Sequence, residues 1–98
     1  MTQMYNPAHP GAVLRHALSE ISIAEAARRL GVPRATLSRI LSKSASVTPD
    51  MDLRLSKALG TSSGIWYQMQ ADYDMWQARR RFKAKVKPIK STLPPEAA

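Results

Sequence analysis

The sequence contains no cysteine among its 98 residues. This absence excludes a disulfide framework, a thiolate metal site and a cysteine nucleophile, and it fits a reducing compartment. No apolar run approaches the roughly 18–20 residues that a membrane-spanning helix needs, and the N-terminal residues lack the apolar core of a secretion signal. We therefore expect a soluble protein of the cytoplasm with no membrane partner.

Groups that could carry catalysis are also scarce. The only histidines, His9 and His16, lie seven residues apart and share no helix face with a carboxylate pair. Two pairs of acids are spaced two residues apart: Asp50 with Asp52, and Asp72 with Asp74. On a helix this spacing points the side chains about 200° apart, which suits surface or capping acids better than general acid–base partners. With no glycine-rich phosphate loop either, we expect no enzyme activity, no metal site and no cofactor.

Acidic residues are few, and the positive charge is unevenly distributed. The chain has 15 basic and seven acidic side chains. Residues 1–78 hold eight basic and six acidic side chains, whereas residues 79–98 hold seven basic and one acidic. The total favours a polyanionic partner such as nucleic acid. Most of the excess positive charge, however, belongs to residues 79–98 and not to residues 1–78.

Apolar periodicity and capping residues predict five helices in the body and no strand. Ser22 and Glu25 have the spacing of a capping box, Thr48 precedes a proline as an N-cap, and Ser62 or Ser63 would cap the last helix. The first helix would bury Val13, Leu14, Ala17, Leu18 and Ile21. The predicted helices cover residues 10–20, 23–31, 33–42, 49–60 and 64–81.

This order of helices predicts an all-α domain over residues 9–81. Residues 1–8 carry no periodic pattern and are expected to form an irregular N-terminal arm. Residues 82–98 form a basic, proline-containing tail. The length allows one small core and not two.

The second and third predicted helices fit a helix-turn-helix. Ala26 and Ala27 place small side chains where two helices must nearly touch. Gly31 occupies the position where the chain leaves the first of the two helices with a positive φ angle. The apolar contacts that lock the pair are Leu30, Val32, Leu37 and Ile40. All of these residues stand at the positions that the motif requires, within a stretch of twenty residues. The pattern is therefore a strong indication of DNA binding.

The third predicted helix, residues 33–42, would enter the major groove of DNA. Leu37, Ile40 and Leu41 cluster on one side, which we expect to be buried. The opposite, small and polar side is expected to face the bases with Arg34, Ala35, Ser38 and Arg39. Arg39 suits a bidentate contact to guanine, whereas Arg34 contacts either a base or a phosphate. The expected phosphate contacts are Arg28, Arg29, Thr36, Ser42 and Lys43.

The last predicted helix and the tail each allow two interpretations. Ile65, Trp66, Met69, Tyr73 and Trp76 share an arc of about 100°. This face either packs on its own core or contributes Tyr73 and Trp76, with Phe82, to a homodimer interface. In the tail, Phe82, Ala84 and Val86 alternate with lysines, as in a strand that would need a second subunit as its partner. The alternative is a disordered basic tail.

Three segments together resemble the HigA family of antitoxins, addiction-module regulators of the Xre/Cro type. They are the helix-turn-helix, NPAHPGAVLR at residues 6–15 and SVTPDMDLRLSKALGTSSGIWYQMQADYDMW at residues 46–76. The resemblance covers about residues 5–78. It implies a compact five-helix, lambda-repressor-like domain that binds, as a homodimer, a palindromic operator in its own promoter. It also implies a HigB-like toxin partner, a ribosome-dependent mRNA endonuclease that the antitoxin would silence.

Two positions depart from the usual family pattern, and other functions remain open. Ile23 stands where many relatives have a glutamine that contacts phosphate, and Ala12 stands where relatives have a glutamate. The resemblance therefore does not imply the phosphate contact at position 23. The alternatives to an autoregulating antitoxin are a solitary Xre-type regulator without a toxin, a phage Cro-like repressor and, least favoured, non-specific nucleic-acid packaging.

Overall fold

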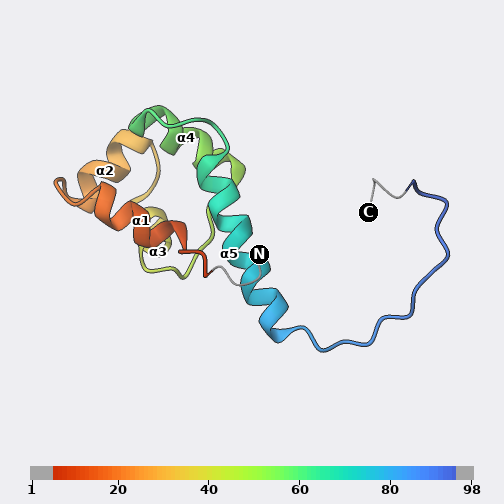
Figure 1. Cartoon of the computed structure of the whole chain (residues 1–98). Helices are drawn as coiled ribbons and strands as arrows, with labels where there is room; N and C mark the ends of the chain where they lie inside the picture. The colour runs from red at the N-terminus through yellow and green to blue at the C-terminus, as the bar shows by residue number, and fades with distance from the viewer. Residues whose placement is uncertain (1–5, 95–98) are drawn as a thin grey trace.

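The computed structural model describes residues 6–94, and the predicted five-helix architecture is confirmed (Figure 1). The helices are α1 (Pro10–Ala17), α2 (Ile23–Leu30), α3 (Arg34–Leu41), α4 (Pro49–Leu59) and α5 (Ile65–Arg81). Within residues 6–94 there is no strand. Figure 1 shows α1 to α4 gathered into one body, with α5 along its side and extending beyond it. Residues 1–5 of the predicted arm and 95–98 of the predicted tail lie outside the described residues.

The core forms where α3 packs on α1 and α2, and where α4 packs on α2 and α5. Leu37 and Leu55 are fully buried, and Ala26 and Ala27 are almost so. Gly31 ends α2 with φ of 73°, as the helix-turn-helix pattern predicts, and leaves room for the Arg54 guanidinium. Eleven hydrophobic residues make up the buried cluster: Leu14, Ala26, Ala27, Leu30, Leu37, Ile40, Leu41, Val47, Met51, Leu55 and Trp66.

The expected apolar faces of two helices are partly wrong. The first helix ends at Ala17 instead of about Glu20. Of its predicted apolar residues Leu14 is buried and Leu18 is half-buried, whereas Ala17 is exposed and Val13 and Ile21 are 38% and 37% exposed. On α5, Ile65 was expected on the buried arc but is 46% exposed. Ile21 lies in the connection after α1, and Ile65 is the first residue of α5, so neither residue lies within the part of a helix that packs on the core.

The N-terminus of α5 is capped differently from the sequence prediction. Gly64 is the N-cap, and neither Ser62 nor Ser63 caps the helix with its side chain. Instead Asp52, a buried side chain of α4, accepts three backbone N–H groups. Gly64 donates to Oδ2 at 2.6 Å, while Trp66 and Tyr67 donate to Oδ1 at 2.8 and 2.9 Å. One carboxylate therefore caps a helix distant from it in sequence and joins α4 to α5.

A second polar connection joins α5 to the start of α1. Buried His9 is the N-cap of α1, and its Nδ1 accepts the Gly11 N–H at 2.9 Å. Gln70 of α5 accepts the Val47 N–H at 2.9 Å, while its amide nitrogen lies 3.4 Å from His9 Nε2. Burial lowers the pKa of His9; nearby Asp74 partly opposes this effect and Lys43 adds to it. The neutral imidazole is the form that can accept from Gly11.

Gly11 allows α1 to approach α3 closely. A Cβ added at this position would collide with the backbone carbonyl oxygen of Ile40. The absence of a side chain therefore lets the first turn of α1 press on the last turn of α3. This contact explains the glycine that follows His9 and Pro10 in the sequence.

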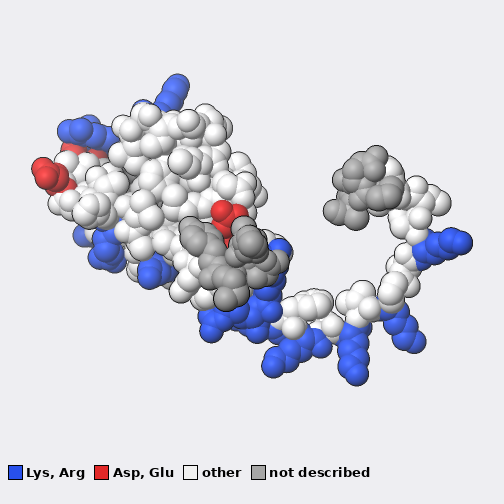
Figure 2. All heavy atoms as spheres, viewed as in Figure 1, with Lys and Arg blue, Asp and Glu red and all other residues white. Residues whose placement is uncertain are grey.

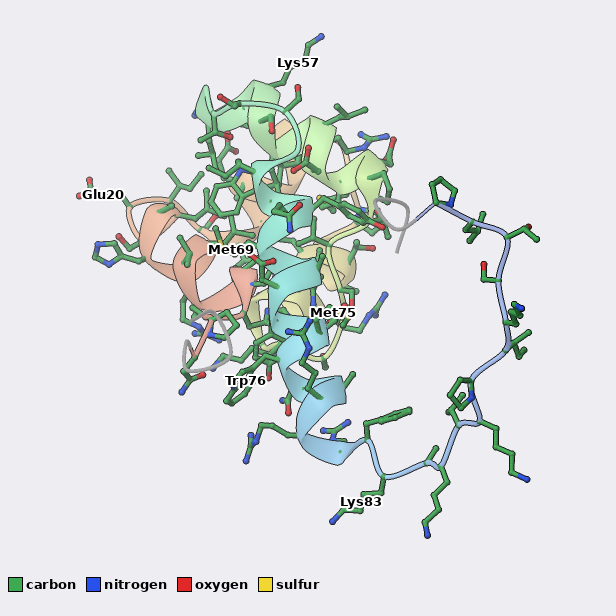
Figure 3. The ribbon with its side chains drawn as sticks, turned by 45° about the vertical axis from the view of Figure 1, so that its right-hand side comes forward. Glu20, Lys57, Met69, Met75, Trp76 and Lys83 are labelled. Carbon is green, nitrogen blue, oxygen red and sulfur yellow. The ribbon has the colours of Figure 1, made fainter. Side chains whose placement is uncertain are left out.

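The second half of α5 extends away from the body and leads into the tail. Its buried residues, Trp66 and Gln70, lie in the first two turns. In Figure 3, Trp76 points toward the body and Met75 to the other side of the helix. Residues 82–94 form neither helix nor strand in the single chain. The predicted tail strand depends on a second chain and stays a prediction.

Replacing Asp52 by Ala should destabilise the fold strongly. Three buried N–H groups would lose their acceptor, at about 1–3 kcal/mol each, so we expect a loss of about 3 kcal/mol or more in the free energy of unfolding. Urea denaturation of Asp52→Ala measures it. Asp50→Ala is the matched control, because Asp50 is also a first-turn acid of α4 but is exposed and pairs only with Arg54. Equal losses in both variants would contradict the capping role.

Candidate nucleic-acid interface

The third helix is held by its apolar side and presents its polar side to solvent. Leu37, Ile40 and Leu41 are buried against α1 and α2, as predicted. All four predicted base contacts, and three of the five predicted phosphate contacts, lie on α3 or directly after it. The exposed residues are Arg34, Ala35, Ser38, Arg39, Ser42 and Lys43, and Thr36 is half-buried. The structure thus brings seven of the nine predicted contacts onto one helix and its C-terminal turn.

The N-terminus of α3 differs from those of α2 and α4. Both of these helices have a side-chain N-cap, Ser22 or Thr48, and acidic residues in the first turn. The N-cap of α3 is Pro33, which makes no side-chain cap, and Arg34 occupies the first turn where an acid would be favourable. A cation at the positive end of a helix dipole is locally unfavourable. This exception to the capping rules suits a helix end that meets an anion.

The C-terminus of α3 is rigidly held through the Arg39 carbonyl oxygen. This oxygen accepts from the backbone N–H groups of Ser44 and Ala45 at 2.9 and 3.2 Å. It also accepts from the hydroxyls of Ser42 and Ser44 at 3.1 and 3.2 Å. Lys43 completes the turn with φ of 68°, a left-handed conformation that is uncommon for a lysine. The backbone of Arg39 is therefore fixed, while its side chain remains exposed.

These bonds bear on the predicted phosphate contact of Ser42. Its hydroxyl lies within hydrogen-bond distance of both the Arg39 carbonyl oxygen and the Ser44 hydroxyl, so it would have to give up one of these contacts before donating to a phosphate. Lys43 has no such constraint on its charged end. The phosphate role of Ser42 stays a prediction.

Arg28 and Arg29 lie on α2 and are both joined to Glu25. Arg28 Nη2 lies 2.6 Å and Arg29 Nε 2.7 Å from Glu25 Oε2. Hydrogen bonds from Arg28 and then Arg29 lower the pKa of the exposed Glu25 carboxyl to about 2, and the same pair raises the pKa of Arg28. Glu25 is therefore ionised at any physiological pH. A DNA phosphate would have to compete with this carboxylate for both arginines.

Sequence reasoning interpreted Glu25 only as part of a capping box. The Ser22 hydroxyl does accept the Glu25 N–H at 3.0 Å, which confirms that half of the motif. The Glu25 carboxylate, however, turns toward the arginines at i+3 and i+4. That spacing of opposite charges was the signal in the sequence that could have revealed the ion pairs.

Arg15 is a candidate that sequence reasoning missed. It is exposed on α1, and its Nη2 donates to the Leu41 carbonyl oxygen at 3.3 Å, at the end of α3. The close approach that Gly11 permits brings this cation next to the candidate interface. Its position four residues after Gly11 could have indicated the location, since both then lie on one face of the first helix.

The predicted dimer residues do not lie together. Tyr73 is half-buried with its ring edge-on to His9 at 5.0 Å between centroids, and Trp76 lies 6.3 Å from Tyr73. Arg80 covers the Trp76 ring at 4.6 Å. Phe82, by contrast, is 65% exposed beyond the end of α5. A dimer role for these three residues stays a prediction.

Positive charge continues beyond the helix-turn-helix. Figure 2 shows Lys and Arg side chains along the end of α5 and the extended segment after it. Among residues 6–94 no group of three His, Asp or Glu side chains is arranged to hold a metal ion. In the same part of the chain no helix is long and apolar enough to cross a membrane. Between residues 79 and 94 every charged side chain is cationic.

Comparison with known proteins gives consistent similarities. A family described as helix-turn-helix matches residues 17–66. The chain is 34% identical over 96 residues to Virulence-associated protein A of Dichelobacter nodosus. The aligned residues cover 94% of each of the two sequences.

Solved structures with the same fold include two of similar size. An addiction module antidote protein of a HigA family from Coxiella burnetii has a TM-score of 0.74 and 33% identity, covering 78% of this chain and 86% of that one. The Pseudomonas aeruginosa antitoxin HigA, solved with the higBA promoter, also has a TM-score of 0.74, with 30% identity and coverage of 86% and 99%.

Glu25→Gln should strengthen binding to DNA of unrelated sequence. Removing the carboxylate charge releases Arg28 and Arg29 for phosphate, so we expect an affinity increase of about 3- to 10-fold and a steeper salt dependence. Fluorescence anisotropy with a labelled duplex at several salt concentrations measures both quantities.

The matched control is Glu20→Gln. Glu20 lies in the exposed turn after α1, where Figure 3 labels it, and this substitution makes the same change in net charge without releasing an arginine pair. If both variants gain equally, net charge alone accounts for the effect and Glu25 does not restrain the arginines.

Proposed function

Since this chain belongs to the helix-turn-helix family, as a HigA-like regulator of the Xre/Cro type, we propose that it represses transcription by binding a palindromic operator as a homodimer. The promoter it occupies would be that of its own operon. The observation that carries the proposal is α3: an exposed polar face on a helix that three buried side chains hold firmly. A DNA-binding regulator of this kind acts in the cytoplasm.

The proposed contacts follow from the chemistry of the α3 face. Arg39 donates two parallel hydrogen bonds to O6 and N7 of a guanine, the pairing for which its planar guanidinium is suited. Ala35 lies against a thymine methyl group, and Ser38 donates or accepts at a base edge. The fixed Arg39 backbone supports this assignment, because a bidentate contact requires a well-positioned side chain.

Arg34 and the flanking cations hold the DNA backbone. Arg34 extends from the uncapped first turn of α3, where the helix dipole also attracts a phosphate. At the other end of the helix, Lys43 and Arg15 would contact phosphates; the hydrogen bond from Arg15 to the Leu41 carbonyl supports this role. These contacts set the orientation of α3 without distinguishing bases.

A homodimer would place two copies of α3 in successive major grooves about 34–36 Å apart. The complex of the Pseudomonas aeruginosa HigA relative with the higBA promoter supports operator binding by this fold. The tail adds to the affinity. Its lysines, with the arginines at the end of α5, would provide attraction to phosphate that does not depend on sequence.

A HigB-like toxin is the second partner that we propose. The antidote and antitoxin names of the relatives, at about one-third identity, support it. Co-expression with the product of a short reading frame next to the gene, followed by purification through a tag on this chain, tests the proposal. Capture of that product supports the antitoxin, whereas no such reading frame favours a solitary regulator.

Arg39→Ala should abolish sequence preference while non-specific binding persists. Loss of a bidentate guanine contact costs about 1–3 kcal/mol, so we expect operator affinity to fall about 10- to 100-fold at fixed salt. The operator is obtained by selecting bound duplexes from a random pool, and affinity is measured by anisotropy against operator and scrambled DNA.

Two controls distinguish the contact from charge. Lys57→Ala removes one cation from α4, away from the α3 face, and should leave the ratio of operator to scrambled affinity unchanged. Arg39→Lys keeps the charge but cannot make the bidentate contact, so it should behave like the alanine variant. A selected pool without palindromic sequences, or an unchanged ratio in Arg39→Ala, contradicts the proposal.

A further inference from the structure

The segment that follows α5 is cationic, exposed and extended. Between residues 79 and 94 the chain carries seven lysines and arginines and no acid. Every residue from 82 to 94 is exposed, and none of them lies in a helix or strand. Figure 2 shows the basic side chains continuing from the end of α5 along this segment. We call residues 82–94 the tail segment; its charge suits a polyanion.

A proline keeps the middle of the tail segment extended. The ring of Pro88 fixes its own φ near −65° and disfavours the helical conformation at Lys87. Because Pro88 also has no N–H, α5 could not continue through this point without losing a helical hydrogen bond. Residues 84–90 read AKVKPIK, with no aromatic side chain. This part of the tail segment is therefore a slender, extended chain.

Lysines are regularly spaced along this slender chain. Lys83, Lys85 and Lys87 alternate with smaller or apolar residues, so an extended backbone places the three lysines on one side. Successive lysines then lie about 6.6 Å apart. Lys90 follows Lys87 after three residues, the repeat of a polyproline II helix. A row of cations on a thin chain fits a narrow groove between two lines of phosphates.

The minor groove of DNA has this form. It is about 6 Å wide, half the width of the major groove, so it admits an extended segment but not a helix. Its negative potential is strongest where runs of A·T pairs make it narrowest, and basic side chains inserted there are attracted by that potential. A·T pairs also lack the guanine amino group that occupies the floor of the groove at G·C pairs. A slender basic chain therefore prefers A·T pairs.

A row of contacts places the start of the tail segment near the end of α3. The first turn of α1, which His9 caps, lies against the carbonyl of Ile40 in α3. The His9 ring lies 5.0 Å from the Tyr73 ring, and Tyr73 lies 6.3 Å from Trp76, between ring centroids. Arg80, in the last turn of α5, covers the Trp76 ring at 4.6 Å. Since each step is a single contact, α5 ends on the side of the molecule where α3 ends.

The tail segment is long enough to reach a neighbouring groove. From Phe82 to Lys90 an extended chain spans about 26 Å, at about 3.3 Å per residue. The minor groove next to a bound α3 lies half a helical turn away, about 17 Å along the DNA axis. Lys43 and Arg15, the proposed phosphate contacts, lie at the same end of α3. The tail segment would therefore begin beside the DNA backbone.

We propose that the tail segment binds the minor groove next to the operator half-site and favours A·T base pairs there. Lys85, Lys87 and Lys90 enter the groove, while Val86 and Ile89 lie against its sugar walls. This contact rests on the operator binding of the proposed function and adds a preference at base pairs that α3 does not reach. It comes in addition to the general attraction of the tail lysines to phosphate.

Cleavage of DNA from a single attached reagent locates the tail segment. Because the chain has no cysteine, Ser91→Cys gives one attachment point for an iron–EDTA group, which cuts nearby deoxyriboses. On the selected operator we expect localised cuts on both strands, offset toward the 3′ side as for a source in the minor groove. Cuts offset toward the 5′ side, or cuts spread evenly over the duplex, would overturn the proposal.

Replacing base pairs at the cut positions tests the preference. Three duplexes share one operator core and carry A·T, inosine·cytosine or G·C pairs at those positions. Inosine·cytosine keeps the major-groove pattern of G·C but lacks the amino group in the minor groove. The natural chain should bind the first two duplexes at least about fivefold more tightly than the third at fixed salt, as fluorescence anisotropy measures.

Substitutions in the tail segment supply the matching protein variants. Lys85→Ala/Lys87→Ala/Lys90→Ala should bind all three duplexes with equal affinity and should keep the preference for the operator core over a scrambled core. Lys87→Ala and Lys57→Ala each remove one lysine, and only the first should reduce the difference between A·T and G·C flanks. Lys57 lies on α4 and is therefore the control for net charge.

The outcomes distinguish this contact from operator recognition by α3. A flank preference that disappears in the triple variant supports the minor-groove contact. Equal binding of the natural chain to all three flanks, or a flank preference that persists in the triple variant, overturns it and leaves the proposed function intact if the core preference remains. A flank preference without any core preference supports the minor-groove contact and contradicts the proposed function.

Discussion

The position of α3 depends on one carboxylate at the far side of the fold, that of Asp52. Asp52 accepts three N–H groups at the start of α5 and so determines the direction in which that helix runs. The direction of α5 places Gln70 beside His9 and Val47. His9 caps α1, and Gly11 of α1 presses on the carbonyl of Ile40 in α3. A polar framework therefore links α4, α5, α1 and α3 in that order, and the apolar core fills the space between them.

The candidate interface departs from the capping and charge pattern of α2 and α4. The N-termini of α2 and α4 have both a side-chain cap, from Ser22 or Thr48, and acidic residues in the first turn. At α3 a proline replaces the cap and an arginine replaces the acid. On α2, Glu25 holds two arginines that are candidates for phosphate contact. The arginines thereby remain partly neutralised until a stronger anion competes for them, which would limit binding to arbitrary DNA relative to a specific operator.

Local patterns in the sequence predicted most of the fold because they reflect contacts between near neighbours. Gly31 needs a positive φ angle, and Leu37, Ile40 and Leu41 share one side of a helix, whatever surrounds them. The serine caps expected for α5 failed for the opposite reason. Asp52 lies twelve or more residues from the amides it binds, and no periodicity marks such a pair. Gln70 was missed likewise, since a polar residue on an amphipathic helix suggests solvent until its partners are known.

The sequence by itself determined the five helices, the helix-turn-helix and the polar face of its second helix, because helix propensity, capping and apolar spacing act within a few residues. Only the tertiary structure decided which of these faces are covered. Val13, Ile21 and Ile65 are apolar yet partly exposed, while Asp52 and Gln70 are polar yet buried. Burial depends on where helices cross, and the crossings are set by hydrogen bonds and close approaches between segments far apart along the chain.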